Sequence, residues 1–424
     1  IRDPLTANRI RERYTRLHTA LPAIDGLVLD LDPASLGGAS SSERAASLTT
    51  LLDLLHGVCS GVDWDLWVRL DAKKPDELEW MTKGVTDSNP SIGGFVPIAI
   101  HEWSPKSPYH PALGTFGERR QIVEFDLANR NFGRCILPYC YAERVAEQLK
   151  FARGKGAVGA VARVDCGKDH VIGSACAINL WTFCRFLQNP STSLETVWSD
   201  YFRETFGKSD QEQLRACLES TDEVVERVFL SEGSLFLSDE SRIPSLKGAQ
   251  NRLSEEGLSN WDPSFARTER NLLKMSTYTA GKLVKEKDEA VARALEARAV
   301  LERARSGVTI NGYIALSSQM SILDDAARLW RDITYTYCAY QIWKQNETDE
   351  SARNRLELAH KHLSSWSKYF VTVYGGDNPI FSAERMAVFC NELEPPAPPE
   401  QKESATSTPP GEVPKSPYRP QRKR

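Results

Sequence analysis

Acidic side chains follow several short β-rich runs of the chain, and they are the residues best suited to catalysis. The candidates for catalytic carboxylates are Asp32, Glu102, Glu124 and Asp126. A pair of carboxylates can hydrolyse a glycosidic bond, one as the acid that protonates the leaving oxygen and one as base or nucleophile. Glu124 and Asp126 are two positions apart, so in a strand they share one face.

Basic, polar and aromatic residues lie near the same runs and are candidates for substrate binding. Arginine binds anionic groups in a bidentate fashion, and tryptophan stacks on the apolar face of a sugar. The candidate substrate-binding residues are Arg69, Asp71, His101, Trp103, Arg163, Asp165 and Trp181. Each side chain also has a structural explanation, because acidic residues at strand ends often cap helices or pair with arginine.

Other chemistries lack their motifs in this sequence. His101 and Glu102 are adjacent and would point to opposite faces of a strand, and no HExxH spacing exists, so we expect no metal site. There is no GxSxG motif for a serine hydrolase and no GxGxxG loop for a dinucleotide. We therefore expect no cofactor.

The secondary structure that must position these residues is predicted to be of the α/β class, in which strands alternate with helices. Five short runs rich in Val, Ile and Leu predict strands buried on both faces, as in parallel sheets. The predicted strands are residues 24–31, 64–70, 95–101, 121–127 and 158–164. Helical segments at 42–57, with Ser42 as N-cap and Gly57 as stop signal, and at 143–153 separate some of them. This alternation predicts βαβ units.

The fold predicted from this order is the C-terminal part of a (β/α)8 TIM-type barrel followed by an α-helical domain. A complete barrel needs eight strands, so its beginning is expected to lie upstream. Residues 1–190 are predicted to be the partial barrel and 191–392 the helical domain, with a connector at 231–262 and long helices at 263–305, 311–346 and 350–374. The Pro- and Ser-rich segment 393–424 is predicted to be a disordered tail.

Charge and hydropathy narrow the partners. The formal net charge is −4, with 53 basic and 57 acidic side chains, which gives no bulk electrostatic reason to bind nucleic acid. No apolar run reaches the roughly 18 residues of a membrane span, and no signal peptide is visible at the start of the chain. We therefore expect a carbohydrate ligand and neither a nucleic acid nor a membrane partner, and leave localisation and oligomeric state open.

Several segments resemble the α-glucuronidase family of glycoside hydrolases. The resemblance rests on 121–134 (QIVEFDLANRNFGR), 97–113 (PIAIHEWSPKSPYHPAL), 156–165 (GAVGAVARVD) and 179–207, with Asp25-Gly26 before an earlier strand. It covers residues 1–210 in scattered motifs. The resemblance implies a sugar-binding (β/α) barrel that hydrolyses a glycoside, including the glycoside of a uronic acid.

The same resemblance marks departures at the expected catalytic positions. Arg130 stands where the family has a glutamate, Ala99 stands where it has an aspartate, and a third acid falls near Pro33, beside Asp32. Arginine cannot act as a base at neutral pH. Two hypotheses therefore stay open: a glycosidase that uses other carboxylates, with Arg69 and Arg163 binding an anionic sugar, or an inactive barrel remnant that serves carbohydrate binding or assembly.

Overall fold

The computed structural model describes residues 4–31, 36, 38, 40–72, 74–98, 109–207, 212–235, 237–255, 272–375 and 378–394. The chain separates into two compact units, Ile1–Glu394 and Pro395–Arg424, and the second unit lies outside the described residues. The predicted disordered tail falls almost wholly in that second unit. The predicted boundary near residue 190 stays a prediction.

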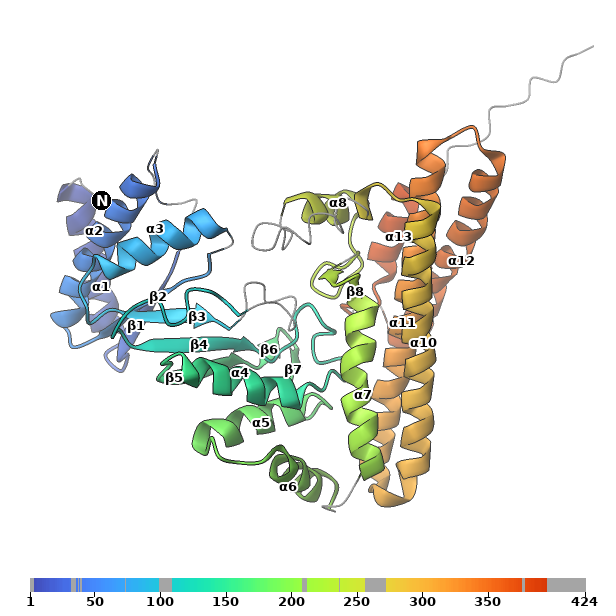
Figure 1. Ribbon diagram of the computed structural model, residues 1–424, viewed down its shortest axis with the longest axis horizontal. Coiled ribbons are helices and arrows are strands. Elements are labelled where there is room, and N and C mark those ends of the chain that lie inside the picture. Colours follow the sequence, from blue (N-terminus) through green and yellow to red (C-terminus); the bar gives the residue numbers. More distant parts are fainter. Residues whose placement is uncertain are drawn as a thin grey trace, which may run out of the picture. The chain divides into compact units, whose positions relative to one another are not determined.

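A five-stranded parallel sheet is the centre of the N-terminal half, and its strands follow one another in chain order. The strands are β1 (Gly26–Asp30), β2 (Asp65–Arg69), β3 (Gly93–Pro97), β4 (Gln121–Asp126) and β5 (Gly159–Arg163). All five predicted strands are confirmed, although β3 begins two residues earlier than predicted. The sheet is the curled parallel sheet of a half barrel (Figure 1).

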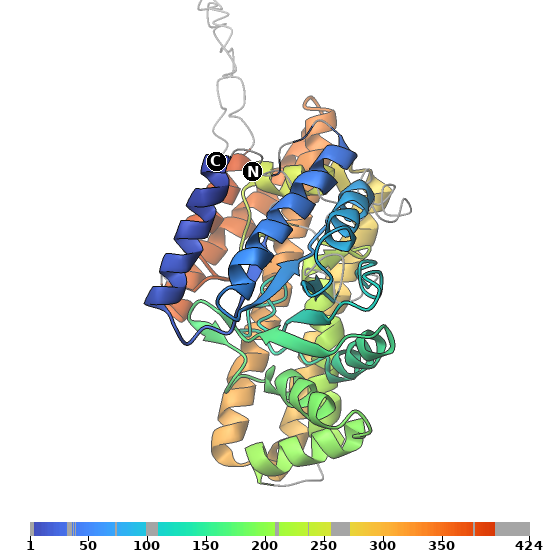
Figure 2. The same cartoon turned by 90° about the vertical axis from the view of Figure 1, so that its left-hand side faces the viewer.

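Helices cover one face of this sheet. Helix α2 (Ser41–Ser60) and helix α3 (Pro75–Thr86) pack side by side (Figures 1 and 2). The first turn of α2 is fixed by a capping box between Ser40 and Glu43, so Ser42 is not the N-cap. Gly57 does not end α2, because glycine inside a helix costs only about 1 kcal/mol and the buried Leu55 and Cys59 on either side pack into the core.

Burial along the strands separates two faces. In β4, Gln121, Val123 and Phe125 are buried, whereas Ile122, Glu124 and Asp126 are partly exposed. This alternation confirms that Glu124 and Asp126 share a face. The buried face packs on the helices, and the partly exposed face is the one that would line the interior of a closed barrel.

The N-terminal half also contains four more helices and a short hairpin. Helix α1 (Pro4–Ala20), which the sequence did not predict, precedes β1, and α4 (Ala142–Gly154) joins β4 to β5. A two-stranded hairpin of β6 (Asp165–Cys166) and β7 (Asp169–His170) comes next, then α5 (Ala177–Gln188) and α6 (Leu194–Phe206). Ser193 caps the start of α6, and Gly207 ends it in the left-handed conformation at φ 76°.

Long helices form the second half. They are α7 (Glu212–Phe229), α10 (Thr277–Ala304), α11 (Ile310–Gln345), α12 (Glu350–Tyr374) and α13 (Ala383–Glu392). Helix α10 packs on α7 and on α11 (Figure 1). The long helices predicted at 311–346 and 350–374 are confirmed, whereas the helix predicted at 263–305 begins at Thr277, after a non-helical stretch at 274–276. The predicted connector 231–262 is wrong in part, because the segment contains α8 (Leu246–Glu255) and the end of a hairpin of β8 (Leu230–Ser231) and β9 (Ser234–Leu235).

A buried ionic network ties the two halves together. Arg144 of α4 donates from Nη2 to both carboxylate oxygens of Asp222 of α7, at 3.1 and 2.8 Å. Its Nη1 donates to Glu226 Oε1 at 2.8 Å. The hydroxyl of Tyr139 also donates to Glu226, at 3.3 Å. The aromatic rings of Phe132 and Phe229 pack edge to face beside it. Residues of the β4–α4 connection are therefore held against α7. No helix among the described residues is long and apolar enough to cross a membrane.

Candidate functional site

The candidate site lies at the carboxyl ends of the strands, on the partly exposed face of the sheet. The parallel register brings Asp30 beside Arg69, and Asp126 beside Arg163. Because all five strands run in the same direction, their last residues meet at one edge. Of the residues predicted to form the site, Arg69, Asp126 and Arg163 end β2, β4 and β5, and Glu124 lies two positions before the end of β4.

Glu124 is held between two arginines. Arg69 Nε donates to Glu124 Oε2 at 2.8 Å, and Arg163 Nη2 lies 3.6 Å from Glu124 Oε1. The three side chains come from β2, β4 and β5 and are about one-fifth exposed. A positioned carboxylate between guanidinium groups suits a base or a nucleophile better than a proton donor.

Arg69 is also shared by two aspartates. Its Nη1 donates to Asp71 Oδ2 at 3.2 Å and lies 3.7 Å from Asp30 Oδ1. The guanidinium groups of Arg69 and Arg163 are therefore directed at carboxylates of the protein itself. A sugar carboxylate that approached them would meet Asp30, Asp71 and Glu124 beside them, so this pair is a poor choice for an anionic ligand.

Asp126 caps the segment that follows β4. Its Oδ2 accepts a hydrogen bond from the backbone N–H of Arg130 at 3.3 Å. Tyr141, at the end of that segment, donates its hydroxyl to Asn129 Oδ1 at 2.9 Å. Burial, and secondarily the charge of Asp126, raises the pKa of Tyr141 well above its usual value. Asn129 (φ 56°) adopts a left-handed conformation, which is strained for a side-chain-bearing residue and common near functional sites.

A second group of charges lies beyond Asp126, and the sequence did not indicate it. Glu240, in a turn that follows β9, lies 3.6 Å from Arg130, 3.8 Å from Arg134 and 3.4 Å from Arg242. The turn is fixed to the β4–α4 connection by Ser241, whose hydroxyl donates to the carbonyl of Arg130 and accepts from the N–H of Gly133, both at 2.8 Å. No local pattern around Glu240 signals this placement.

The other predicted site residues are not all brought together. Asp165 is exposed on β6, and Trp181 lies on α5, where it packs edge to face on Tyr201 and under the guanidinium of Arg185. Asp32, His101, Glu102 and Trp103, and the diagnostic Ala99, lie outside the described residues.

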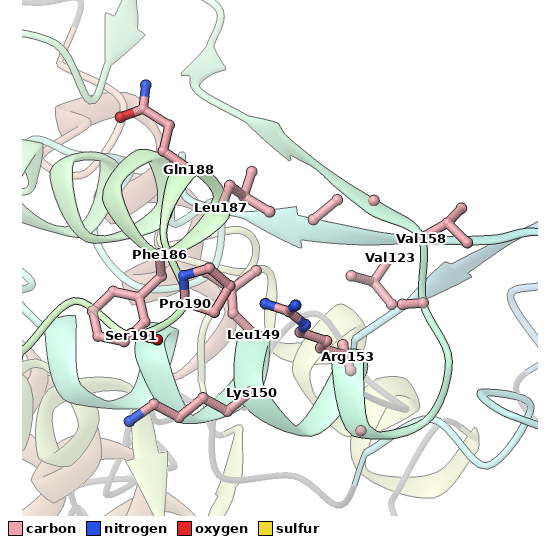
Figure 3. A pocket seen from close by; sticks show the side chains of 15 residues that line it. Val123, Leu149, Lys150, Arg153, Val158, Phe186, Leu187, Gln188, Pro190 and Ser191 are labelled. Atoms are coloured by element: carbon pink, nitrogen blue, oxygen red, sulfur yellow. The ribbon is translucent and has the colours of Figure 1, made fainter.

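Two of the cavities in the described part of the molecule lie away from Glu124. A cavity of about 830 Å³ opens between the end of α4, the start of β5 and the end of α5 (Figure 3). Its walls are apolar, with Val123, Leu149 and Phe186, and its charged lining is Lys150 and Arg153. No carboxylate lines it, and it lies at the amino end of β5, so it does not suit glycoside hydrolysis.

Trp181 lines a smaller cavity, of about 300 Å³, together with Tyr201, Phe206 and Gln319. This cavity lies between α5, α6 and the start of α11 and not at the strand ends. Among the described residues, no group of three or more His, Cys, Asp or Glu side chains is placed to hold a metal ion.

Comparison with known proteins gives a fold and no family. No protein-family model and no curated protein matches the sequence. Among solved structures, the chain is similar to a GH138 enzyme targeting pectin rhamnogalacturonan II, with a TM-score of 0.57 and 11% sequence identity. The likeness covers 92% of this chain and 64% of that chain, so the chain spans under two-thirds of that enzyme's length. The fold is therefore like that of a glycoside hydrolase.

Two weaker likenesses are to other carbohydrate-active enzymes. One is a GH115 4-O-methyl-α-glucuronidase with specificity for decorated arabinogalactans, with a TM-score of 0.46 and 10% identity, covering 88% of this chain and 46% of that one. The other is a mutant O-GlcNAc hydrolase from Thermobaculum terrenum, with a TM-score of 0.40 and 11% identity, covering 90% and 74%. Neither is close enough to assign this chain to the α-glucuronidase family.

Proposed function

We propose that this chain is a glycoside-hydrolase-like protein that binds a carbohydrate at the carboxyl edge of its parallel sheet and hydrolyses a glycosidic bond there. The observation that carries the proposal is Glu124, a partly buried carboxylate held by Arg69 at 2.8 Å and Arg163 at 3.6 Å where barrel enzymes place their chemistry. The fold likeness to a GH138 enzyme supports the same class of chemistry.

In this proposal Glu124 attacks the sugar or activates water, and Asp126 is the alternative on the same face. Asp32 and Glu102 remain the candidates for the acid that protonates the leaving oxygen. Substrate contacts are assigned to Asp71, Asp165, His101 and Trp103. A uronic-acid glycoside remains the proposed substrate class, although Arg69 and Arg163 are committed to Glu124.

A panel of aryl glycosides and aryl uronides tests the proposal. We expect turnover by the natural chain and a loss of about a hundredfold or more in Glu124→Gln. Glu296→Gln is the matched control, because Glu296 is an exposed glutamate on α10, far along the chain from the sheet. Absence of turnover on the whole panel, or equal turnover by Glu124→Gln, would contradict hydrolysis at this site.

The second candidate function is non-catalytic carbohydrate binding. It is favoured by Arg130, which stands where the resemblance expects a glutamate and which lies 3.6 Å from Glu240. Ala99, the other departure, points the same way. Measurable sugar binding without turnover would support this function. Restoring the acids with Ala99→Asp and Arg130→Glu would then be expected to create hydrolytic activity. If the natural chain is already active and these substitutions add nothing, the non-catalytic function is contradicted.

A further inference from the structure

Arg134 is a buried arginine whose hydrogen-bonding capacity is largely unused. Its side chain is only 8% exposed. Its Nη2 donates to the carbonyl of Cys166 at 3.0 Å, but neither Nε nor Nη1 donates a hydrogen bond within the described part of the chain. Buried guanidinium donors are expensive to leave unsatisfied, so such atoms in a native protein call for an explanation.

The acidic groups nearest to Arg134 are too far away to satisfy it. Asp169 Oδ2 lies 3.5 Å from Nε, and Glu240 Oε2 lies 3.8 Å from Nη1. Charge-assisted hydrogen bonds are normally about 2.7–2.9 Å long. The same protein reaches 2.8 Å in the pairs of Arg69 with Glu124 and of Arg144 with Glu226. Arg134 therefore lacks the close carboxylate partner that Arg69 and Arg144 each have.

Glu240 faces two further arginines on its solvent side. Its carboxylate lies 3.6 Å from Arg130 and 3.4 Å from Arg242, and all three side chains are about one-third exposed. Three guanidinium groups thus surround one carboxylate without a close hydrogen bond to it. The backbone of Glu240 is left-handed (φ 50°), a strained conformation for glutamate that tends to persist at ligand sites.

We propose that Arg130, Arg134 and Arg242 form a carboxylate-binding subsite in which Glu240 is a built-in occupant that a ligand carboxylate displaces. The planar fork of arginine matches a carboxylate in two parallel hydrogen bonds, and a free ligand can adopt that geometry where the tethered Glu240 does not. The subsite stands on these distances. Naming the ligand a uronic acid rests on the proposed carbohydrate function.

This subsite adjoins the strand edge and differs from the one expected from the sequence. The backbone of Arg130 is bonded to Asp126 at the end of β4, so a uronate carboxylate held here would place its sugar ring next to that strand end. Arg69 and Arg163, in contrast, are committed to Glu124 at the same edge.

Calorimetric titration of the full chain with sodium glucuronate tests the subsite, with glucose as the neutral comparison and acetate and inorganic phosphate as simple anions. We expect glucuronate to bind and glucose to bind more weakly. Glu240→Gln removes the competing charge and should bind glucuronate about tenfold more tightly, whereas Arg242→Gln should bind it about tenfold more weakly, as expected for one charged hydrogen bond.

Glu232→Gln is the matched control, because Glu232 is also a left-handed glutamate (φ 49°) in the same segment but pairs with Lys282. It should leave glucuronate binding unchanged. Arg134→Gln could fail to fold, so the partly exposed Arg242 carries the test. Equal affinities for glucuronate in the natural chain, Glu240→Gln and Arg242→Gln overturn the subsite, as does the absence of binding to all of the anions by the natural chain and Glu240→Gln.

The comparison ligands separate this proposal from the proposed function. Acetate or phosphate that binds as tightly as glucuronate would overturn the uronic-acid assignment and leave an oxyanion subsite. Glucuronate binding that depends on Arg242 in a chain without glycosidase turnover would uphold the subsite and contradict hydrolysis. Turnover of neutral aryl glycosides, together with glucuronate binding that Arg242→Gln leaves unchanged, would uphold hydrolysis and contradict the subsite.

Discussion

Arg69 and Glu124 meet across an intervening strand. Arg69 ends β2 and Glu124 lies in β4, yet Arg69 Nε is 2.8 Å from Glu124 Oε2. Neighbouring strands are about 4.8 Å apart, so this contact spans about 9–10 Å of sheet over β3. The side chain of Arg69 therefore holds the candidate catalytic carboxylate of Glu124 from two strands away in the curled sheet.

Arg69→Met should lower the free energy of unfolding. The substitution keeps the apolar stem but leaves the partly buried Glu124 with the more distant Arg163, at 3.6 Å. We expect the free energy of unfolding to fall by about 1–3 kcal/mol in urea denaturation. The exposed Arg16, which pairs with Glu12 on the same helix, provides Arg16→Met as a control that should change the free energy of unfolding by less than about 0.5 kcal/mol. Equal effects would contradict a special role for Arg69.

Arg144→Met should be more damaging. It removes the cation bound to Asp222 and to Glu226, and Glu226 is only 4% exposed. Leaving a buried carboxylate without its cation costs about 3–5 kcal/mol, measured as a shift of the urea midpoint. Arg215→Met is the matched control, because Arg215 pairs with the more exposed Glu195 and Glu219 and should cost under about 1 kcal/mol. A small loss for Arg144→Met would show that the two halves do not depend on this network.

The sequence predicted the strands and long helices because their signals are local. Short apolar runs located all five strands, and apolar residues at helical spacing located the helices that became α11 and α12. Helix α3 was missed because its buried face, with Trp80, Met81 and Val85, is short and follows Pro75 within a charged segment. Helix α1 was missed although Ile10, Tyr14 and Leu17 recur at helical spacing and pack against the core, because the charged residues between them bury no side chain completely.

The candidate site was predictable only where it follows strand ends. Arg69, Glu124, Asp126 and Arg163 could be named from their positions near the carboxyl ends of predicted strands, but their pairing depends on the register of β2, β4 and β5. Glu240 could not be found, because the turn that holds it is joined to Arg130 through Ser241, 111 positions later in the chain. Long-range contacts of this kind leave no mark on local spacing.

Gly93→Ala should disturb the inner face of the sheet. A Cβ at Gly93 would lie 2.2 Å from Cε3 of Trp67, whose ring lies over β3 and under the guanidinium of Arg120 at 4.8 Å. Relieving that overlap should cost about 1–3 kcal/mol and change the tryptophan fluorescence. Gly57→Ala is the control, because a Cβ there meets nothing within 4 Å and lies inside α2, so it should stabilise by about 0.5–1 kcal/mol. A neutral Gly93→Ala would contradict this packing.

Lys287 should give the unfolding free energy a specific pH dependence. Its ammonium on α10 is fully buried and donates to the carbonyls of Arg227, Val228 and Leu230 at the end of α7, at 2.5, 3.0 and 2.6 Å. Burial lowers the pKa of Lys287 from 10.5 to about 8. Between these values the unfolded chain holds a proton that the folded chain has released, so this lysine makes stability rise from pH 8 to pH 10.5.

Buried thiols act in the opposite direction over the same range, because burial raises the pKa of Cys338 to about 12 and the unfolded chain loses that proton first. The contribution of Lys287 is therefore measured as the difference between the natural chain and Lys287→Met in urea denaturation at several pH values. We expect the natural chain to gain stability relative to the variant as pH rises from 8 to 10.5. A constant difference would show that the three carbonyls keep the ammonium protonated throughout, and would contradict the lowered pKa.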